Sequence, residues 1–274
     1  MTQNVWGRRG DWPARRAALV DGLRELNPDL VALPEAIVTE EYDQVRDVLG
    51  DDFHVAHQQA REPGGGGDVE PGQGHSIASR WPLGEVRELD LHLTPAAEGF
   101  ACGTLAAEVL APEPLGPLVF AFHNPSWKLH QAHERELQAV AAADFLAAFA
   151  EGRAQHVIVA ADLDSDPEAS SVRYWSGRQA LGGTSVCYRD AWESIHPGEP
   201  GHTFTPENPI MIGRDWPFRR IDYVLVRCGE HEGPTLAITA CERIFDQAVD
   251  GVWASDHYGL CVDLEVPSPH ATRS

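Results

Sequence analysis

Three short apolar runs, each followed almost at once by a polar residue, constrain the fold of this chain most strongly. The runs comprise residues 30–33, 118–122 and 157–161. They are too short for buried helices and rich in Val, Ile, Leu and Phe, which is typical of strands covered on both faces. Glu35, His123 and Asp162 follow them. Strand ends are rigid and their loops reach solvent, so these side chains are candidates for one shared site.

Helix patterns alternate with the strand patterns. An amphipathic pattern predicts a helix over residues 12–26 that ends at Asn27-Pro28, and further helices are expected over 40–49 and 133–149. The alternation predicts a single α/β domain of packed sheets over residues 1–266, with a disordered tail over 267–274. We expect a loop at the rim of the site over residues 61–74, because four consecutive glycines interrupt it. Other strands are expected at 5–6, 53–57, 75–82, 86–93, 103–109, 221–226 and 260–266.

The composition excludes some classes of protein. The net charge is −21 and Lys128 is the only lysine, so there is no basic stripe of the kind that generic nucleic-acid binders carry. This acidity disfavours nucleic acid as a partner without excluding it, since bound divalent cations reverse the local potential. The five cysteines form no Cys-x-x-Cys pair and predict neither a zinc site nor a disulfide framework. No signal region or membrane-spanning run is present, and we expect a cytoplasmic protein.

Asp162 and Asp164 form the most compact acidic motif. Residues i and i+2 of an extended strand share a face, so both carboxylates are expected to address one cation. The alternative is an Asx-turn or a helix cap, which acids after strands often provide. Glu35 has the same two interpretations.

Two segments near the C-terminus place an imidazole beside acids. Asp256-His257 precedes an apolar strand, and Asp222 lies within another, where an unpaired carboxylate is costly. We expect Asp222 to orient His257 and nearby carboxylates to raise the pKa of its imidazole. His123 is a candidate donor to a phosphoryl oxyanion. A structural histidine is the alternative for both.

Seven short motifs occur in a recognisable order. They are Asn-x-Trp at 4–6, Leu-Pro-Glu at 33–35, Ser-Arg-x-Pro at 79–82, Phe-His-Asn at 122–124, Asp-Leu-Asp at 162–164, Arg-Ile-Asp-Tyr at 220–223 and Ser-Asp-His at 255–257. A stretch with Asp-Ala-Trp and His-Thr-Phe-Thr, ending at Asn208-Pro209, lies between the Asp-Leu-Asp and Arg-Ile-Asp-Tyr motifs. Together the motifs resemble the endonuclease/exonuclease/phosphatase superfamily from residue 4 to about residue 264. The resemblance implies a DNase I-like fold, a four-layer α/β/β/α sandwich of two mixed sheets between helices.

The resemblance also implies site roles. A Mg²⁺ or Mn²⁺ ion would be held by Asn4, Glu35 and Asp256. The catalytic residues would be His123, Asp162, Asp164, Asp222 and His257, with Asp162 deprotonating the attacking water. The substrate would be contacted by Arg80, Asn124 and Asn208. Two departures from the family pattern affect this site: Pro34 replaces the usual Gln before the metal ligand, and Asp164 replaces the usual Asn.

These observations predict a divalent-metal-dependent phosphoester hydrolase acting by direct attack of water. The acidic surface favours a phosphorylated small molecule or lipid head group as substrate. The alternatives are a DNA or RNA nuclease with the same site, or an inactive binding protein of this fold. Residues 64–67 and the Arg-aromatic segment 214–220 are the candidate substrate-gripping surfaces.

Overall fold

One six-stranded mixed sheet forms the centre of the protein. The computed structural model describes residues 1–59, 70–97, 101–211, 217–230 and 233–267. The strand order of the sheet is β4-β5-β6-β7-β9-β8. Only β6 and β7 pair in parallel, and the other neighbours are antiparallel. The strands are β4 (Leu83–Asp90), β5 (Gly103–Val109), β6 (Leu118–Asn124), β7 (His156–Asp162), β8 (Tyr188–Asp190) and β9 (Asp222–Arg227).

A second layer of strands consists of two pieces. The first is a three-stranded antiparallel sheet with the order β1-β3-β2, and the second is the antiparallel pair β10-β11. Isolated bridges from Thr2 to Ala32 and to Leu260 connect the pieces. The N-terminal segment therefore lies between them. The strands are β1 (Leu30–Ile37), β2 (His54–His57), β3 (Gln73–Ser79), β10 (Ala237–Ile244) and β11 (Gly259–Glu265).

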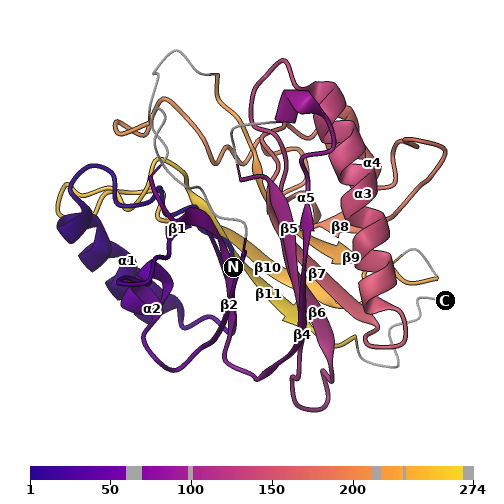
Figure 1. Ribbon diagram of the computed structural model, residues 1–274, viewed down its shortest axis with the longest axis horizontal. Coiled ribbons are helices and arrows are strands. Elements are labelled where there is room, and N and C mark those ends of the chain that lie inside the picture. Colours follow the sequence, from indigo (N-terminus) through magenta and orange to yellow (C-terminus); the bar gives the residue numbers. More distant parts are fainter. Residues whose placement is uncertain (60–69, 98–100, 212–216, 231–232, 268–274) are drawn as a thin grey trace.

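Helices cover the outer faces of both layers (Figure 1). An apolar core with side chains from both layers, including Ile77 and Phe120, fills the space between them. A second core packs α3 (Ala132–Ala150) and α4 (Ser170–Trp175) on the six-stranded sheet. A third packs α1 (Trp12–Leu26) and α2 (Gln44–Leu49) on β1 and β3. The helix, sheet, sheet, helix order agrees with the expected layers, although the second sheet is made of separate pieces. The remaining helical elements are the short η1 (Pro95–Ala97) and α5 (Ala191–Ile195).

The boundaries of the elements test the sequence patterns. The predicted helix over 12–26 and strand over 103–109 are confirmed to the residue. The helix expected from residue 40 begins at Gln44, because the Asp43 side chain caps it by accepting from Val45 N and Arg46 N. Neither α4 nor β10 was predicted. The strand expected at 5–6 is wrong, since Trp6 has φ 56° and the N-terminal bridges are made by Thr2.

Two other predictions concern residues at the edge of the described chain. Residues 61–69, most of the predicted rim loop over 61–74, lie outside the described residues, and Gln73 and Gly74 belong to β3. The predicted tail from residue 268 onward also lies outside them. Among the residues that the structure describes, no helix combines the length and apolar character needed to cross a bilayer.

The strand topology brings distant parts of the sequence to one edge of the molecule. Because β9 runs antiparallel to β7, the last residue of β7, Asp162, pairs with the first residue of β9, Asp222. Asn124 ends the neighbouring parallel strand β6. His257 lies just before β11, which pairs with Thr2.

Candidate active site

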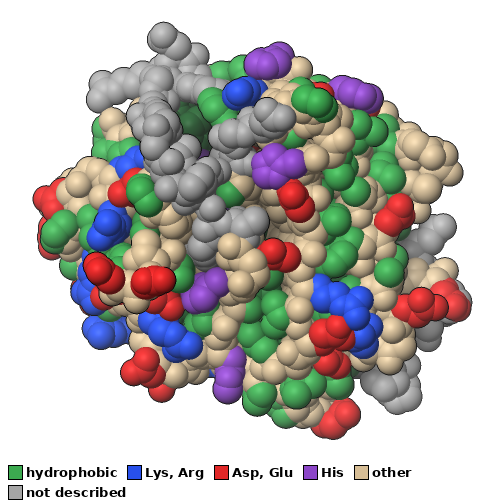
Figure 2. Space-filling view, in the orientation of Figure 1, with side chains coloured by type: hydrophobic (Ala, Val, Ile, Leu, Met, Phe, Trp, Pro, Cys, Tyr) green, Lys and Arg blue, Asp and Glu red, His purple; other side chains and the backbone are tan. Residues whose placement is uncertain are grey.

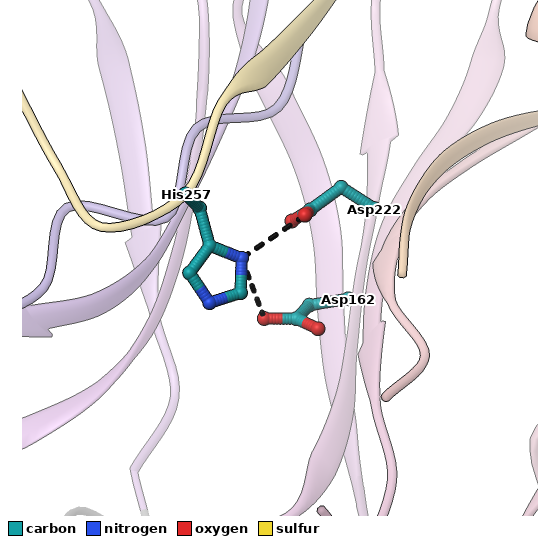
Figure 3. Close-up of side chains that lie close together, drawn as sticks. All are labelled: Asp162, Asp222 and His257. Atoms are coloured by element: carbon teal, nitrogen blue, oxygen red, sulfur yellow. Dashed lines mark hydrogen bonds and ion pairs between the residues drawn. The ribbon is translucent and has the colours of Figure 1, made fainter. Parts of the chain in front are cut away.

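Asp162, Asp222 and His257 form a compact buried cluster between the layers (Figure 3). His257 Nδ1 lies 3.0 Å from Asp222 Oδ2 and 3.8 Å from Asp162 Oδ2. Each of the three residues is less than a tenth exposed. Figure 3 shows the other ring nitrogen directed away from both carboxylates, and no described residue hydrogen-bonds it. The arrangement therefore leaves Nε2 available to an outside group.

The cluster is strongly polarised. Burial by itself lowers the pKa of His257, but the Asp222 and Asp162 carboxylates outweigh it and raise that pKa well above its usual value. Burial and the nearby carboxylates of Asp222 and Asp164 raise the pKa of Asp162 well above its usual value. The imidazole is thus held as a cation that donates from Nδ1 to Asp222. Thr203 fixes this acid, because its Oγ1 accepts from Ile221 N at 3.2 Å and from Asp222 N at 3.1 Å.

Asn4 connects the cluster to Glu35. Its Nδ2 donates to Glu35 Oε1 at 3.1 Å and to Asp162 Oδ2 at 3.2 Å. Its Oδ1 accepts from Trp6 N at 2.9 Å, which fixes the amide orientation. Gln3 Nε2 donates to the carbonyls of Asn4 and His257, so the N-terminal segment is tied to both halves of the site.

Glu35 occupies a bulge in β1. The pairing register with β3 shifts between Leu33 and Ala36, and Glu35 has φ 58°, a left-handed conformation that costs a non-glycine residue about 1–2 kcal/mol. Bulges redirect side chains next to active sites. Pro34 contributes its carbonyl, which accepts from Val5 N at 3.1 Å. Pro34, which stands where the family usually has Gln, therefore supports the site through a backbone contact to the N-terminal segment that carries Asn4.

Asp256 is the third buried carboxylate of the site, after Asp162 and Asp222. Burial, with a smaller contribution from Glu35, raises its pKa to about 6, although His257 and Arg15 oppose the rise. Ser255 Oγ donates to Asp256 Oδ1 at 3.3 Å. Arg15 of α1 is itself buried and donates to Ala254 O at 3.0 Å and to Arg9 O at 2.7 Å. It therefore joins the segment before Asp256 to the loop after Asn4.

The donor set fits a hard divalent cation. Asp162 Oδ1 and Asp222 Oδ1 are buried without a hydrogen-bond partner, and neighbouring carboxylates contribute to the raised pKa values of Asp162 and Asp256, so the site is short of positive charge. Mg²⁺ and Mn²⁺ favour carboxylate and amide oxygens. The Asp162, Asp222 and His257 cluster is compact enough to hold an ion. Because His257 Nδ1 already donates to Asp222, the oxygens of Glu35 and Asp256 are the better ligands.

Asp164 adopts a conformation that the sequence pattern did not predict. Strand β7 ends at Asp162, and Asp164 has φ 48°, so the face-sharing expected of an extended Asp-x-Asp is wrong. Asn and Asp tolerate this left-handed conformation, which explains how Asp can replace the usual Asn. Burial outweighs the opposing charges of Arg219 and His257 and raises the pKa of Asp164 to about 6. Arg219 Nη2 also donates to the Asp164 carbonyl.

His123 and Asn124 lie on opposite faces of β6. His123 faces α4, where the Trp175 ring is 5.6 Å away. Thr104 Oγ1, on the neighbouring strand β5, is 2.8 Å from its Nδ1. Burial lowers the pKa of His123 to about 3, so its ring is neutral. The structure does not join His123 to the cluster by a hydrogen bond among the described residues. Asn124 Nδ2 instead donates to Asp162 O at 2.7 Å, which places Asn124 as a support for Asp162.

Two predicted substrate contacts are corrected. Arg80 follows the end of β3 that pairs with Leu30, at the opposite end of β1 from Glu35, and it donates to Pro28 O and Asn27 Oδ1. Asn208 has no exposed surface, and its Nδ2 donates to Ser255 O at 2.7 Å. Arg80 is thus remote from the cluster, and Asn208 fixes the backbone before Asp256.

The predicted gripping surfaces are only partly described. Residues 64–67 and 212–216 lie outside the described chain. Arg220 is buried and forms an ion pair with Asp190 at 2.7 Å, so it does not present a free surface cation. Phe218 is about half exposed.

Sequence reasoning missed several residues that shape the site. They are Gln3, Arg9, Arg15 and Thr203. Gln3 directly precedes the Asn-x-Trp motif, and Thr203 lies within the His-Thr-Phe-Thr stretch. Position next to or inside a motif was therefore the available signal. Arg15 resembles any polar residue of an amphipathic helix, and nothing in its sequence context indicates burial.

Comparison with known proteins agrees with this geometry. A model of the endonuclease/exonuclease/phosphatase family matches residues 1–257. No curated protein sequence matches the chain. A humanized TDP2 from D. rerio is 19% identical, with a TM-score of 0.71 and 97% of each chain covered. D. rerio TDP2 complexed with single strand DNA product is 20% identical, with a TM-score of 0.71, covering 94% of this chain and 95% of that one.

A further solved structure is similar. The human Nocturnin catalytic domain with bound sulfate anion is 16% identical, with a TM-score of 0.67, covering 92% of this chain and 88% of that one. At these identities the likeness establishes a shared fold.

Proposed function

This chain belongs to the endonuclease/exonuclease/phosphatase family, and from that premise we propose that it is a divalent-metal-dependent phosphoester hydrolase. The observation that carries the proposal is the buried network in which Asn4 joins Glu35 to Asp162, and His257 lies between Asp162 and Asp222. Burying so many charges is costly. A cluster of strongly shifted pKa values in one place is characteristic of catalytic sites.

His257 and Asp222 stabilise the charge that develops on the phosphoryl group. Asp222 holds the imidazolium through Nδ1, and Nε2–H then donates to a phosphoryl oxygen. Because both partners are buried, this donor is preorganised before the substrate arrives. The His123 ring is held by Thr104 and lies against Trp175, so we assign it a structural role in place of the expected contact to the phosphoryl group.

Asp162 is the proposed general base. Its raised pKa makes it a stronger base than an exposed carboxylate, and its Oδ1 has no hydrogen-bond partner among the described residues. Asn4 and the Asn124-supported backbone fix its direction. Asp162 takes a proton from the attacking water, and the leaving group departs from the opposite side of the phosphorus. No covalent intermediate with the protein forms.

Glu35 and Asp256 are the proposed metal ligands, with Asn4 beside them. When bound, Mg²⁺ or Mn²⁺ polarises the phosphoryl oxygen and stabilises the leaving oxygen. Asp164 contributes further negative charge near this site and is held by Arg219.

We assign a phosphorylated small molecule or lipid head group as the substrate. The chain carries a net charge of −21, and Figure 2 shows the Lys and Arg side chains of one face interspersed with Asp and Glu. A polyanion is repelled by such a surface except near a bound cation. A small phosphoester needs only the local field of the site.

A nucleic-acid strand is the second candidate. It is favoured by the similarity to D. rerio TDP2, whose structure holds a single strand DNA product. The shared fold permits the same phosphodiester chemistry, while the acidic surface argues against strong strand binding.

The experiment measures hydrolysis of bis(p-nitrophenyl) phosphate and p-nitrophenyl phosphate in Mg²⁺, in Mn²⁺ and in EDTA. We expect turnover with either metal and none in EDTA. Full turnover in EDTA, or none with any divalent metal, would contradict the proposal. A parallel panel of sugar phosphates, lipid head-group phosphodiesters and single-stranded DNA separates the two substrate classes. Faster cleavage of the DNA would favour the second candidate.

A further inference from the structure

Arg9 makes an ion pair with the proposed metal ligand Glu35. Arg9 Nη1 lies 3.2 Å from Glu35 Oε2, and the two side chains are 16% and 21% exposed. Asn4 Nδ2 donates to the other oxygen, Oε1, at 3.1 Å. Each oxygen of Glu35 therefore already receives one N–H donor, and one of the two donors carries a full positive charge.

The position of the Arg9 guanidinium is fixed by groups other than Glu35. Its Nη2 donates to Gln73 Oε1 at 2.9 Å, and Gln73 is a buried residue at the start of β3. Its backbone carbonyl accepts from the buried Arg15 at 2.7 Å. Because these contacts hold both the side chain and the backbone, Arg9 stays in place when Glu35 acquires another partner.

The chain folds back sharply to bring Arg9 to this place. Trp6 and Gly7 both have positive φ, 56° and 51°, so the backbone turns between Asn4 and Arg9. The φ of Gly7 lies in the left-handed region that favours glycine, and a Cβ there would also require the end of the Glu70 side chain to move. Asn4 and Arg9 therefore approach the two oxygens of Glu35 from the two ends of one short loop.

We propose that Arg9 is a positioning residue whose fixed positive charge opposes a divalent cation at Glu35 and thereby sets the metal affinity of the site. The inference rests on the assignment of Glu35 as a metal ligand under the proposed function. Like charges separated by a few ångströms in a partly buried site repel strongly, since solvent screens them little. In the metal-free protein the same charge compensates Glu35 beside Asp162 and Asp256. Arg9 thus stabilises the metal-free site and lowers the affinity of the site for a divalent cation.

The chain offers a matched control in the neighbouring arginine. Arg8 carries the same charge but is exposed, and its guanidinium carbon lies 5.1 Å from the centre of the Tyr42 ring. Arg8→Met therefore changes the net charge equally without removing a contact to Glu35. Arg9→Lys keeps the charge but cannot reproduce the forked contact with Gln73 and Glu35.

The test measures Mg²⁺ binding by calorimetry, and thermal unfolding in EDTA and in Mg²⁺, for the wild type and the three variants at pH 7. We expect Arg9→Met to bind Mg²⁺ about tenfold more tightly, as removal of a close like charge implies. In EDTA it should melt at a lower temperature than the wild type. Arg8→Met should match the wild type in both measurements, and Arg9→Lys should bind Mg²⁺ more weakly than Arg9→Met.

The outcomes separate this inference from the proposed function. If the wild type binds Mg²⁺ and a folded Arg9→Met binds it equally or more weakly, the inference is wrong and the hydrolase proposal stands. If Arg9→Lys gains as much affinity as Arg9→Met, the charge is not the cause and the inference is also wrong. If neither the wild type nor any variant binds a divalent ion, both proposals fail.

Discussion

The two ends of the space between the layers differ sharply in chemistry. At one end, Asp162, Asp222 and His257 are buried together. At the other end lies a cavity of about 400 Å³ whose lining includes Leu118 and Phe120. Leu118 begins β6 and Asn124 ends it, so the ends lie about 20 Å apart along one strand at 3.3 Å per residue.

The comparison extends to one arginine at each end. Arg9 donates to the Glu35 carboxylate and to Gln73. Arg80 donates to two neutral oxygens, Pro28 O and Asn27 Oδ1, and lies over the Phe53 ring. Arg80 directly follows strand β3, whereas Arg9 lies in the turn before α1, and only Arg9 pairs with an acid of the site. The difference shows that position at a strand end does not make a site; convergence of charges from separate segments does.

The largest expected effect is a loss of catalysis from a substitution at the acidic end of the space between the layers. Asp162→Asn keeps the shape but removes the proposed base, so the rate of phosphodiester hydrolysis should fall by about 10²–10⁴-fold. The control is Asp29→Asn, the same exchange at an exposed acid lining the far cavity. It should retain wild-type activity. Equal activity of both variants in steady-state assays would remove Asp162 from the mechanism.

The second prediction concerns the apolar end. Leu118 is fully buried and lines the existing cavity, so Leu118→Ala enlarges that cavity and should lower the free energy of unfolding by about 2–5 kcal/mol. Urea denaturation measures this loss. Mg²⁺ affinity of the folded variant should be unchanged, because no metal ligand is touched. A weaker Mg²⁺ affinity would show that the two ends are coupled.

The third prediction uses the raised pKa of Asp256. Its folded pKa of about 6 exceeds the usual 3.8, so the folded state binds more protons, and metal-free stability falls as pH rises from about 4 to 6. Asp256→Asn lacks this loss and should be more stable than the wild type in EDTA at pH 7 by about 3 kcal/mol. The gap should close near pH 4.

Urea denaturation at pH 4.5 and pH 7 measures that gap. Saturating Mg²⁺ should stabilise the wild type and not the variant. The difference between their free energies of unfolding should therefore shrink or change sign. A variant that is less stable than the wild type in EDTA at pH 7 would refute the assignment of a destabilising charge to Asp256.

The smallest expected effect is at the far arginine. Arg80→Ala removes two hydrogen bonds and the ring contact, which should cost about 1–2 kcal/mol of stability. Catalytic rate and KM should stay within about twofold of the wild type, as expected for a surface contact far from the chemistry. A large rise in KM would restore Arg80 as a phosphate contact.

Much of the fold followed from local patterns. The apolar runs predicted the central strands, and the helix over 12–26 has a Pro near its start and Asn27 at its C-cap. Strand β10 and helix α4 were missed for different reasons. Helix α4 has six residues, too few for a helical period to register. In β10 the burial pattern is irregular, because a bulge interrupts its pairing between Ile238 and Ala240.

The candidate site was predictable in composition but less so in geometry. Glu35, Asp162, Asp222, Asp256 and His257 were identified from strand-end acids and a resemblance of motifs, and the structure brings them into one neighbourhood. The contacts that organise them could not be read from the chain. Thr203 supports Asp222, and Arg15 supports the segment before Asp256, through hydrogen bonds to distant backbone groups.

The sequence by itself determined which chemical groups stand at the ends of the buried strands. Only the tertiary structure decided where those groups point. His123 and Asn124 are adjacent, yet the register of β6 with β7 sends Asn124 to Asp162 and the His123 ring to Trp175. A bulge turns Glu35 toward Asn4. Side-chain direction depends on strand register and backbone torsion, which contacts between distant segments fix, and no local pattern encodes those contacts.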